Sequence, residues 1–253
     1  MKFRTISRIV YLKKARHRRG HGIHSPFLFH LITTVLENKR SQPEYKILKD
    51  LKNKALNFLS EFSDQSLSTV YHQFNLPSSN PRRLYRKVEL PIRYGKVVFR
   101  LIREFKPSSV INYGPTFGAN LTLLALANND RPVFQLSDDP AFELVSKKML
   151  NDSAITNVSF SNENSAQLID SEFIIINSST NHDQTRNLIQ KRLSIHGDDD
   201  VLIIRGIHES KEMAVIWKEL IASENVRVSL DLFEIGIALF RKGLQKENFI
   251  QRF

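Results

Sequence analysis

The sequence contains no cysteine and no long apolar run. Without cysteine the chain cannot form disulfides, thiolate-ligated zinc sites or iron–sulfur clusters, and it has no thiol nucleophile. No stretch approaches the roughly 18 consecutive apolar residues that a membrane-spanning helix needs. The absence of cysteine suits a reducing compartment, so we predict a cytoplasmic location, with peripheral association at a membrane as an option.

Acidic residues are scarce in the first part of the chain. Residues 1–106 hold 23 Lys and Arg against 7 Asp and Glu, whereas residues 107–253 hold 14 against 19. The net charge of +11 therefore arises entirely before residue 107. This asymmetry predicts a basic N-terminal extension over residues 1–106 and a separate domain over residues 107–253.

The first 20 residues contain eight basic side chains and no acid. Apolar residues recur among them at helical spacing and predict a basic amphipathic helix: Phe3, Ile6, Ile9, Val10 and Ala15. Residues 2–19 could bind an anionic membrane surface or RNA phosphates, or the helix could bury its apolar stripe against the protein itself. No aromatic residues interleave the basic ones in a stacking pattern, which disfavours a nucleic acid partner.

The rest of the extension is predicted to be mainly helical. Ser25 suits a helix N-cap, and residues 44–62 and 83–106 have helical periodicity, with Pro91 dividing the second stretch. Residues 63–82 are rich in turn-forming residues and predict a linker or an irregular loop.

From residue 108 onward, short β-rich runs alternate with helical segments. Strands are predicted at 110–113, 133–136, 158–160, 173–177, 201–204, 226–232 and 235–241, with helices at 118–128, 140–150, 183–194 and 210–222. This alternation indicates βαβ units and a mostly parallel sheet. The last two strands are too closely joined for a parallel crossover, so they must form an antiparallel hairpin, which we expect at an edge. The predicted class is α/β, with the Rossmann-like layout of class I S-adenosylmethionine (SAM) methyltransferases.

The turn after the first predicted strand carries two glycines. Gly114 directly follows the strand, and Gly118, four residues on, opens the next helix. Glycines at these places allow a sharp turn and a close approach of backbone to ligand. The turn has no Walker-type lysine, which argues against nucleotide hydrolysis.

These features resemble a family of SAM-dependent methyltransferase-like proteins found in Bacteroidetes. The segment around Gly22-Ile23-His24-Ser25-Pro26-Phe27 resembles its N-terminal signature, and 112–118 resembles its glycine turn. Residues 206–217 resemble its fifth-strand segment, and 231–237 its C-terminal hairpin. The resemblance implies that SAM is the cofactor and that the acceptor is a small molecule.

The resemblance also assigns a cofactor site. The residues that it places around SAM are Asn112, Gly114, Pro115, Gly118, Ser137, Asp138 and Asn177. Asn112 stands where the family has a glutamate, and Ser137 where it has the acid that binds the ribose, with Asp138 as a substitute. His182 and His208, beyond the fourth and fifth strands, are candidate general bases.

Related small-molecule O-methyltransferases bind Mg²⁺ through aspartates, whose places here are taken by Asn177 and by Arg205-Gly206. A guanidinium and a glycine cannot replace hard anionic ligands, so no metal site is predicted. Three functions therefore remain open: a metal-independent methyltransferase for a small molecule, a catalytically degenerate binding or scaffold module, and an RNA methyltransferase. The last is disfavoured because the sequence has no Asn-Pro-Pro-Tyr-type motif.

Overall fold

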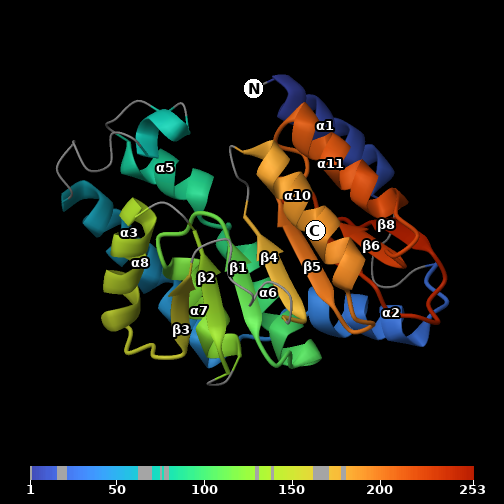
Figure 1. Ribbon diagram of the computed structural model, residues 1–253, viewed down its shortest axis with the longest axis horizontal. Coiled ribbons are helices and arrows are strands. Elements are labelled where there is room, and N and C mark those ends of the chain that lie inside the picture. The colour runs from blue at the N-terminus through green and yellow to red at the C-terminus, as the bar shows by residue number, and fades with distance from the viewer. Residues whose placement is uncertain are drawn as a thin grey trace. The chain divides into compact units, whose positions relative to one another are not determined.

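The computed structural model describes residues 2–15, 22–61, 70–74, 76, 80–128, 131–137, 140–161, 171–177 and 181–253 (Figure 1). Its elements pack into two compact units, one formed by Met1–Lys39 with Ile169–Phe253 and the other by Arg40–Leu168. These units are groups of packed elements. The division at residue 106, which rests on charge and on the resemblance, stays a prediction.

The unit Arg40–Leu168 contains three parallel strands in the order β3-β2-β1. They are β1 (Val110–Tyr113), β2 (Val133–Leu136) and β3 (Val158–Ser161). The helices described in this unit include η2 (Pro43–Lys46), α3 (Ile47–Glu61), α5 (Pro81–Val88), α6 (Ile92–Phe105), α7 (Ala119–Ala127) and α8 (Pro140–Asn151). Every residue of β1 is buried, as expected for a strand covered on both faces. A core of Leu51, Leu84, Phe117, Phe142 and Met149 joins the helices α3, α5 and α8 to the turn before α7.

The other unit contains five strands in the order β4-β5-β7-β6-β8. They are β4 (Phe173–Ile176), β5 (Val201–Arg205), β6 (Val228–Asp231), β7 (Ile235–Leu239) and β8 (Glu247–Ile250). Its helices are α1 (Lys2–Lys14), α2 (Pro26–His30), η1 (Leu31–Leu36), α10 (His182–Ile195) and α11 (Lys211–Ala222). The strands β4 and β5 are parallel, and β7 runs antiparallel to both β5 and β6. The predicted α/β class with a C-terminal antiparallel hairpin is confirmed.

The hairpin does not form the edge, and this part of the prediction is wrong. A further strand, β8, pairs in parallel with the outer side of β6. The Ser229 hydroxyl donates to Asn248 Oδ1 at 2.6 Å across this pair. The strand has only four residues, of which Phe249 alone is buried, so it shows almost none of the apolar pattern that would reveal it.

The helix boundaries of the N-terminal part agree with the predicted signals. The backbone amide of Leu28 donates to Ser25 Oγ at 3.4 Å, which confirms Ser25 as the N-cap of α2. Pro91 separates α5 from α6 as predicted, because it cannot continue a helix. Residues 70–73 are helical, within a segment predicted as irregular. Among the described residues, no helix is both long enough and apolar enough to cross a bilayer.

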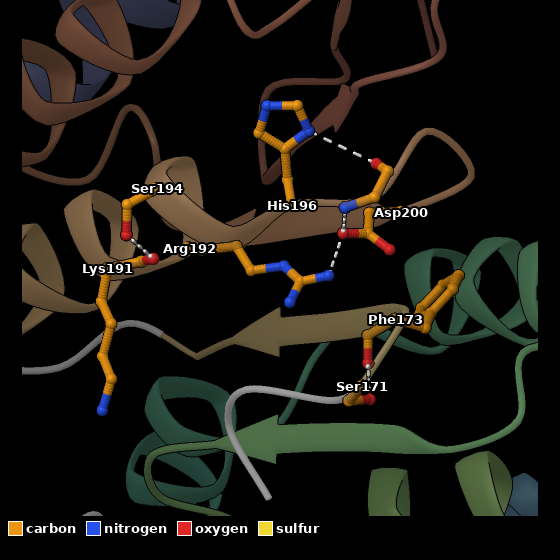
Figure 2. A network of polar contacts seen from close by, with 8 residues as sticks. Ser171, Phe173, Lys191, Arg192, Ser194, His196 and Asp200 are labelled. Carbon is orange, nitrogen blue, oxygen red and sulfur yellow. Dashed lines mark hydrogen bonds and ion pairs between the residues drawn. The ribbon is translucent and has the colours of Figure 1, made fainter. Parts of the chain in front are cut away.

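A buried ion pair anchors the C-terminal end of α10 to the start of β5. The Arg192 guanidinium bonds Asp200, whose Oδ2 also accepts the Gly197 amide at 2.5 Å (Figure 2). Burial lowers the pKa of Arg192 and raises the pKa of Asp200, because both charged forms lose water. Asp200 offsets this loss for Arg192, whereas the Gly197 amide and then Arg192 offset it for Asp200. The pair fixes the end of α10, the helix whose first residue is the candidate His182.

Candidate cofactor site

The turn after β1 requires glycine at both of its predicted positions. Gly114 and Gly118 have φ angles of +95° and +94°, a region that residues with a side chain rarely adopt. A Cβ on Gly118 would lie 2.8 Å from Met149 Cβ and 3.1 Å from Ser146 Cα. Gly118 therefore serves the close packing of this turn on α8, and Gly114 serves the sharp exit from β1.

The same turn is fixed to the end of β2. The Gly114 amide donates to the Leu136 carbonyl at 2.9 Å, and the register pairs Tyr113 with Leu136. Ser137 follows directly and is half-buried. The structure therefore brings Gly114 and Ser137 together at the carboxyl ends of two adjacent parallel strands, where open α/β sheets bind ligands. Pro115 is half-buried in the turn, and Asp138 lies outside the described residues.

Asn112 is buried and already has a protein partner. Its side-chain amide donates to Gln135 Oε1 at 2.5 Å, across the β1–β2 pair. Gln135 Nε2 in turn donates to the Gly114 carbonyl at 2.7 Å. The predicted contact of Asn112 with the methionine part of SAM stays a prediction. What the structure adds is a polar chain that runs from Asn112 through Gln135 to the glycine turn.

Glu89, like Gln135, belongs to this turn's surroundings and was not predicted as a site residue. It lies between α5 and α6 with only 1% of its surface exposed. Its carboxylate accepts three hydrogen bonds from the turn: Thr116 Oγ1 at 2.9 Å, the Phe117 amide at 2.6 Å and the Asn120 amide at 3.0 Å. A buried carboxylate at a helix N-terminus is stabilised by such donors and by the helix dipole. Glu89 therefore holds the turn and the first turn of α7 in place.

The remaining predicted residues belong to the other unit. Asn177 directly follows β4 and is buried, and His182 is the first residue of α10. His182 Nε2 lies 3.5 Å from Ser210 Oγ, the N-cap of α11. The two helix starts border a shallow depression of about 580 Å³, lined by charged side chains that include Arg186, Lys211 and Glu212.

The pKa of Glu212 is lowered, because its carboxylate accepts hydrogen bonds from its own backbone amide and from Ser210. An anionic carboxylate thus stands beside His182 in the depression, together with the cations of Arg186 and Lys211. These surroundings suit a ligand with a polar or charged group better than an apolar ligand.

His208 has a different environment. Its Nε2 lies 2.7 Å from Asp231 Oδ2, at the end of β6. Its ring stacks on Phe233 with centroids 5.1 Å apart, and the ring of Tyr11 from α1 approaches at 6.2 Å. Asp231 also accepts the Phe233 amide at 2.8 Å. The carboxylate therefore orients the imidazole, and His208 shares no described contact with His182.

Asn177 and Arg205, which stand where related enzymes are expected to have metal-binding aspartates, are both buried. Within the part of the chain that the structure describes, no group of three or more His, Asp or Glu side chains is arranged to hold a metal ion. The absence of a metal requirement remains a prediction, which a chelation experiment can test.

No protein-family model and no curated protein matches this sequence. Solved structures do match. A methyltransferase from Podospora anserina, PaMTH1, bound to S-adenosylhomocysteine (SAH), is 10% identical with a TM-score of 0.57, covering 87% of this chain and 97% of its own. The O-methyltransferase TomG from Streptomyces achromogenes, in complex with SAM, is 13% identical with a TM-score of 0.51, covering 73% and 94%. An O-methyltransferase from Bacillus cereus, in complex with SAH, is 14% identical with a TM-score of 0.51, covering 71% and 92%.

The chain has the Rossmann-like fold of class I methyltransferases. At these identities the likeness establishes the fold and not the reaction. The predicted fold is thereby confirmed at the level of architecture. The glycine turn lies between β1 and α7, after the first strand, as predicted.

Proposed function

We propose that this protein is a SAM-dependent methyltransferase that acts without a metal ion on a small-molecule acceptor. The observation that carries the proposal is the turn at Gly114 and Gly118, held at positive φ after β1 in a fold whose solved examples include SAM and SAH complexes. The resemblance to Bacteroidetes methyltransferase-like proteins is in keeping with it.

The residues that the resemblance places around SAM include polar groups that such a cofactor can use. The backbone of 114–118 would lie against it, with Ser137 and Asp138 toward its ribose and with Asn112 and Asn177 as further polar contacts. Bound SAM supplies an electrophilic methyl group on a sulfonium. The protein then has to orient the acceptor and, where the acceptor carries a proton, to remove it.

Two histidines are available for proton removal. His182 borders the depression at the starts of α10 and α11, where an acceptor could reach its ring. His208 is oriented by Asp231 but is packed against Phe233. We propose His182 as the general base and His208 as the second candidate. Arg205 stands where related enzymes have a metal-ligating carboxylate, and a guanidinium cannot bind a divalent cation, so the proposal includes no metal ion.

A second candidate function is a binding module that has lost catalysis. Two observations favour it: Asn112 donates to Gln135, and Glu89 already accepts hydrogen bonds from two amides of the turn and of α7. In both cases polar groups of the candidate site are already bonded to other groups of the protein. The two functions differ in whether SAM or SAH binds.

Calorimetric titration of the intact chain with SAM and with SAH tests the proposal. Saturable one-to-one binding is expected, and Gly114→Val should abolish it, because valine is strained at φ +95° and would fill the turn. Gly243→Val is the matched control: Gly243 has φ +86°, but nothing lies within 4 Å of a Cβ there. Failure of the folded wild-type protein to bind either compound would refute the proposal and leave the binding module.

A further inference from the structure

The N-terminal helix α1 is attached to its unit through one face. Tyr11 is buried, and its hydroxyl donates to the Gln251 carbonyl at 2.5 Å. Arg4 bonds Glu234, and Ala15, just after the helix, is also buried. The Arg8 guanidinium lies 5.7 Å from the centre of the Phe233 ring. Residues 4, 8, 11 and 15 follow helical spacing, so they form a single face.

The apolar residues of α1 lie on another face and are exposed. Ile6, Ile9, Val10 and Leu12 have 61%, 52%, 44% and 43% of their surface exposed. These four make up half of the exposed large hydrophobic residues among those described. The expectation that this stripe packs against the protein itself is therefore wrong for Ile6, Ile9 and Val10. In Figure 1 the helix (dark blue) lies on the outside of its unit, where such a face can meet a partner.

The charged residues of α1 itself are of one sign. Helix α1 contains no acidic residue. Lys13 follows Ile6, Ile9 and Val10 at helical spacing, and Lys14 follows Val10. Neither lysine has an ion-pair partner among the described residues. The sequence continues with Arg16, Arg18 and Arg19, which lie outside the described residues.

We propose that α1 binds an anionic lipid surface with this face, while its other face stays attached to the protein. Ile6, Ile9 and Val10 would enter the boundary between headgroups and acyl chains, and the lysines would lie at the headgroups. A helix with an apolar stripe beside basic residues is complementary to such a surface in both polarity and charge. A protein partner would need an acidic rim around an apolar groove, whereas a membrane offers both features over an unlimited area.

The test is co-sedimentation of the intact chain with vesicles of phosphatidylcholine alone and of phosphatidylcholine mixed with phosphatidylglycerol. We expect binding to the mixed vesicles only, weakening as salt increases. Lys13→Gln with Lys14→Gln should reduce partitioning by about fivefold for each lysine neutralised. Ile6→Ser, Ile9→Ser and Val10→Ser together should reduce it at least about tenfold. These side chains are exposed, so thermal unfolding should change little.

Matched variants separate the helix from general properties of the chain. Lys49→Gln with Lys54→Gln removes the same charge from exposed positions on α3, and Leu144→Ser removes an exposed apolar residue from α8. Both should bind vesicles like the wild type. Equal losses in these controls, or no binding of wild type to anionic vesicles, would overturn the proposal. A dimer detected by light scattering that the triple serine variant converts to a monomer would also overturn it. So would binding of the protein to RNA without binding to vesicles.

Discussion

Glu89 provides the sharpest test of how the glycine turn is held. Its carboxylate accepts the Phe117 and Asn120 amides and the Thr116 hydroxyl, and it is 1% exposed. Glu89→Ala removes the acceptor oxygens of all three hydrogen bonds at once. Water cannot easily replace them, since Phe117 and Thr116 are buried as well.

The magnitude follows from the groups left without partners. A buried backbone N–H that loses its acceptor costs about 1–3 kcal/mol, and two amides are affected in Glu89→Ala. The free energy of unfolding should therefore fall by about 2–6 kcal/mol, a large part of the roughly 5–15 kcal/mol of a typical domain. Glu89→Gln keeps the Oε1 position as an acceptor but turns an amide donor toward the Asn120 N–H. It should cost about 1–3 kcal/mol.

Denaturation in guanidinium chloride, followed by circular dichroism, measures these losses. Glu143→Gln is the matched control, because Glu143 contacts Lys147 on the surface of α8 and its loss should cost under about 0.5 kcal/mol. A Glu89→Gln variant as stable as Glu143→Gln would refute the reasoning. If the turn also holds the cofactor, Glu89→Gln should weaken SAM binding when it is measured without denaturant, where the variant is still folded.

Three further outcomes are expected. Gly118→Ala should lower the free energy of unfolding by about 2–4 kcal/mol in the same assay, because its Cβ would meet Met149 at 2.8 Å and its φ is +94°. Asp200→Ala should cost about 3–5 kcal/mol by leaving the buried Arg192 uncompensated, and replacing both partners with apolar residues should recover most of the loss; equal instability of the double variant would contradict this. Excess EDTA should leave SAM binding and methyl transfer unchanged, since in our proposal Arg205 stands in the place of a carboxylate ligand; activity lost to EDTA and restored by Mg²⁺ would show otherwise.

The strands were predictable where apolar runs are bounded by turn residues. The predicted strands at Val110–Tyr113 and Val133–Leu136 coincide with β1 and β2, because each is a short apolar segment between breakers. The strand β8 was not predictable, since its pairing depends on an open edge of β6 and not on its own pattern.

The position of the glycine turn was predictable, but its supports were not. Glycine is the residue that most readily adopts a positive φ, so the turn positions Gly114 and Gly118 could be predicted from the sequence. Glu89 and Gln135 act through partners 21 to 31 residues away, and no local pattern reports such a pair. The available signal was an isolated acid between Val88 and Leu90, a place where an acid is buried only if it is bonded.

The helix α1 shows why periodicity predicts a face but not what that face contacts. The predicted stripe correctly groups Ile6, Ile9 and Val10 on one face, but Ala15 lies on the attached face. The attachment itself uses Arg4 and Tyr11, which form directional bonds to Glu234 and to the Gln251 carbonyl. An amphipathic helix of a self-contained domain normally turns its apolar side inward, since that burial stabilises it. A helix held by polar and aromatic contacts, with Ile6 and Ile9 outward, forgoes that stabilisation in the free protein. In our proposal an anionic lipid surface restores that stabilisation, and this makes the vesicle experiment the decisive one for the N-terminal part.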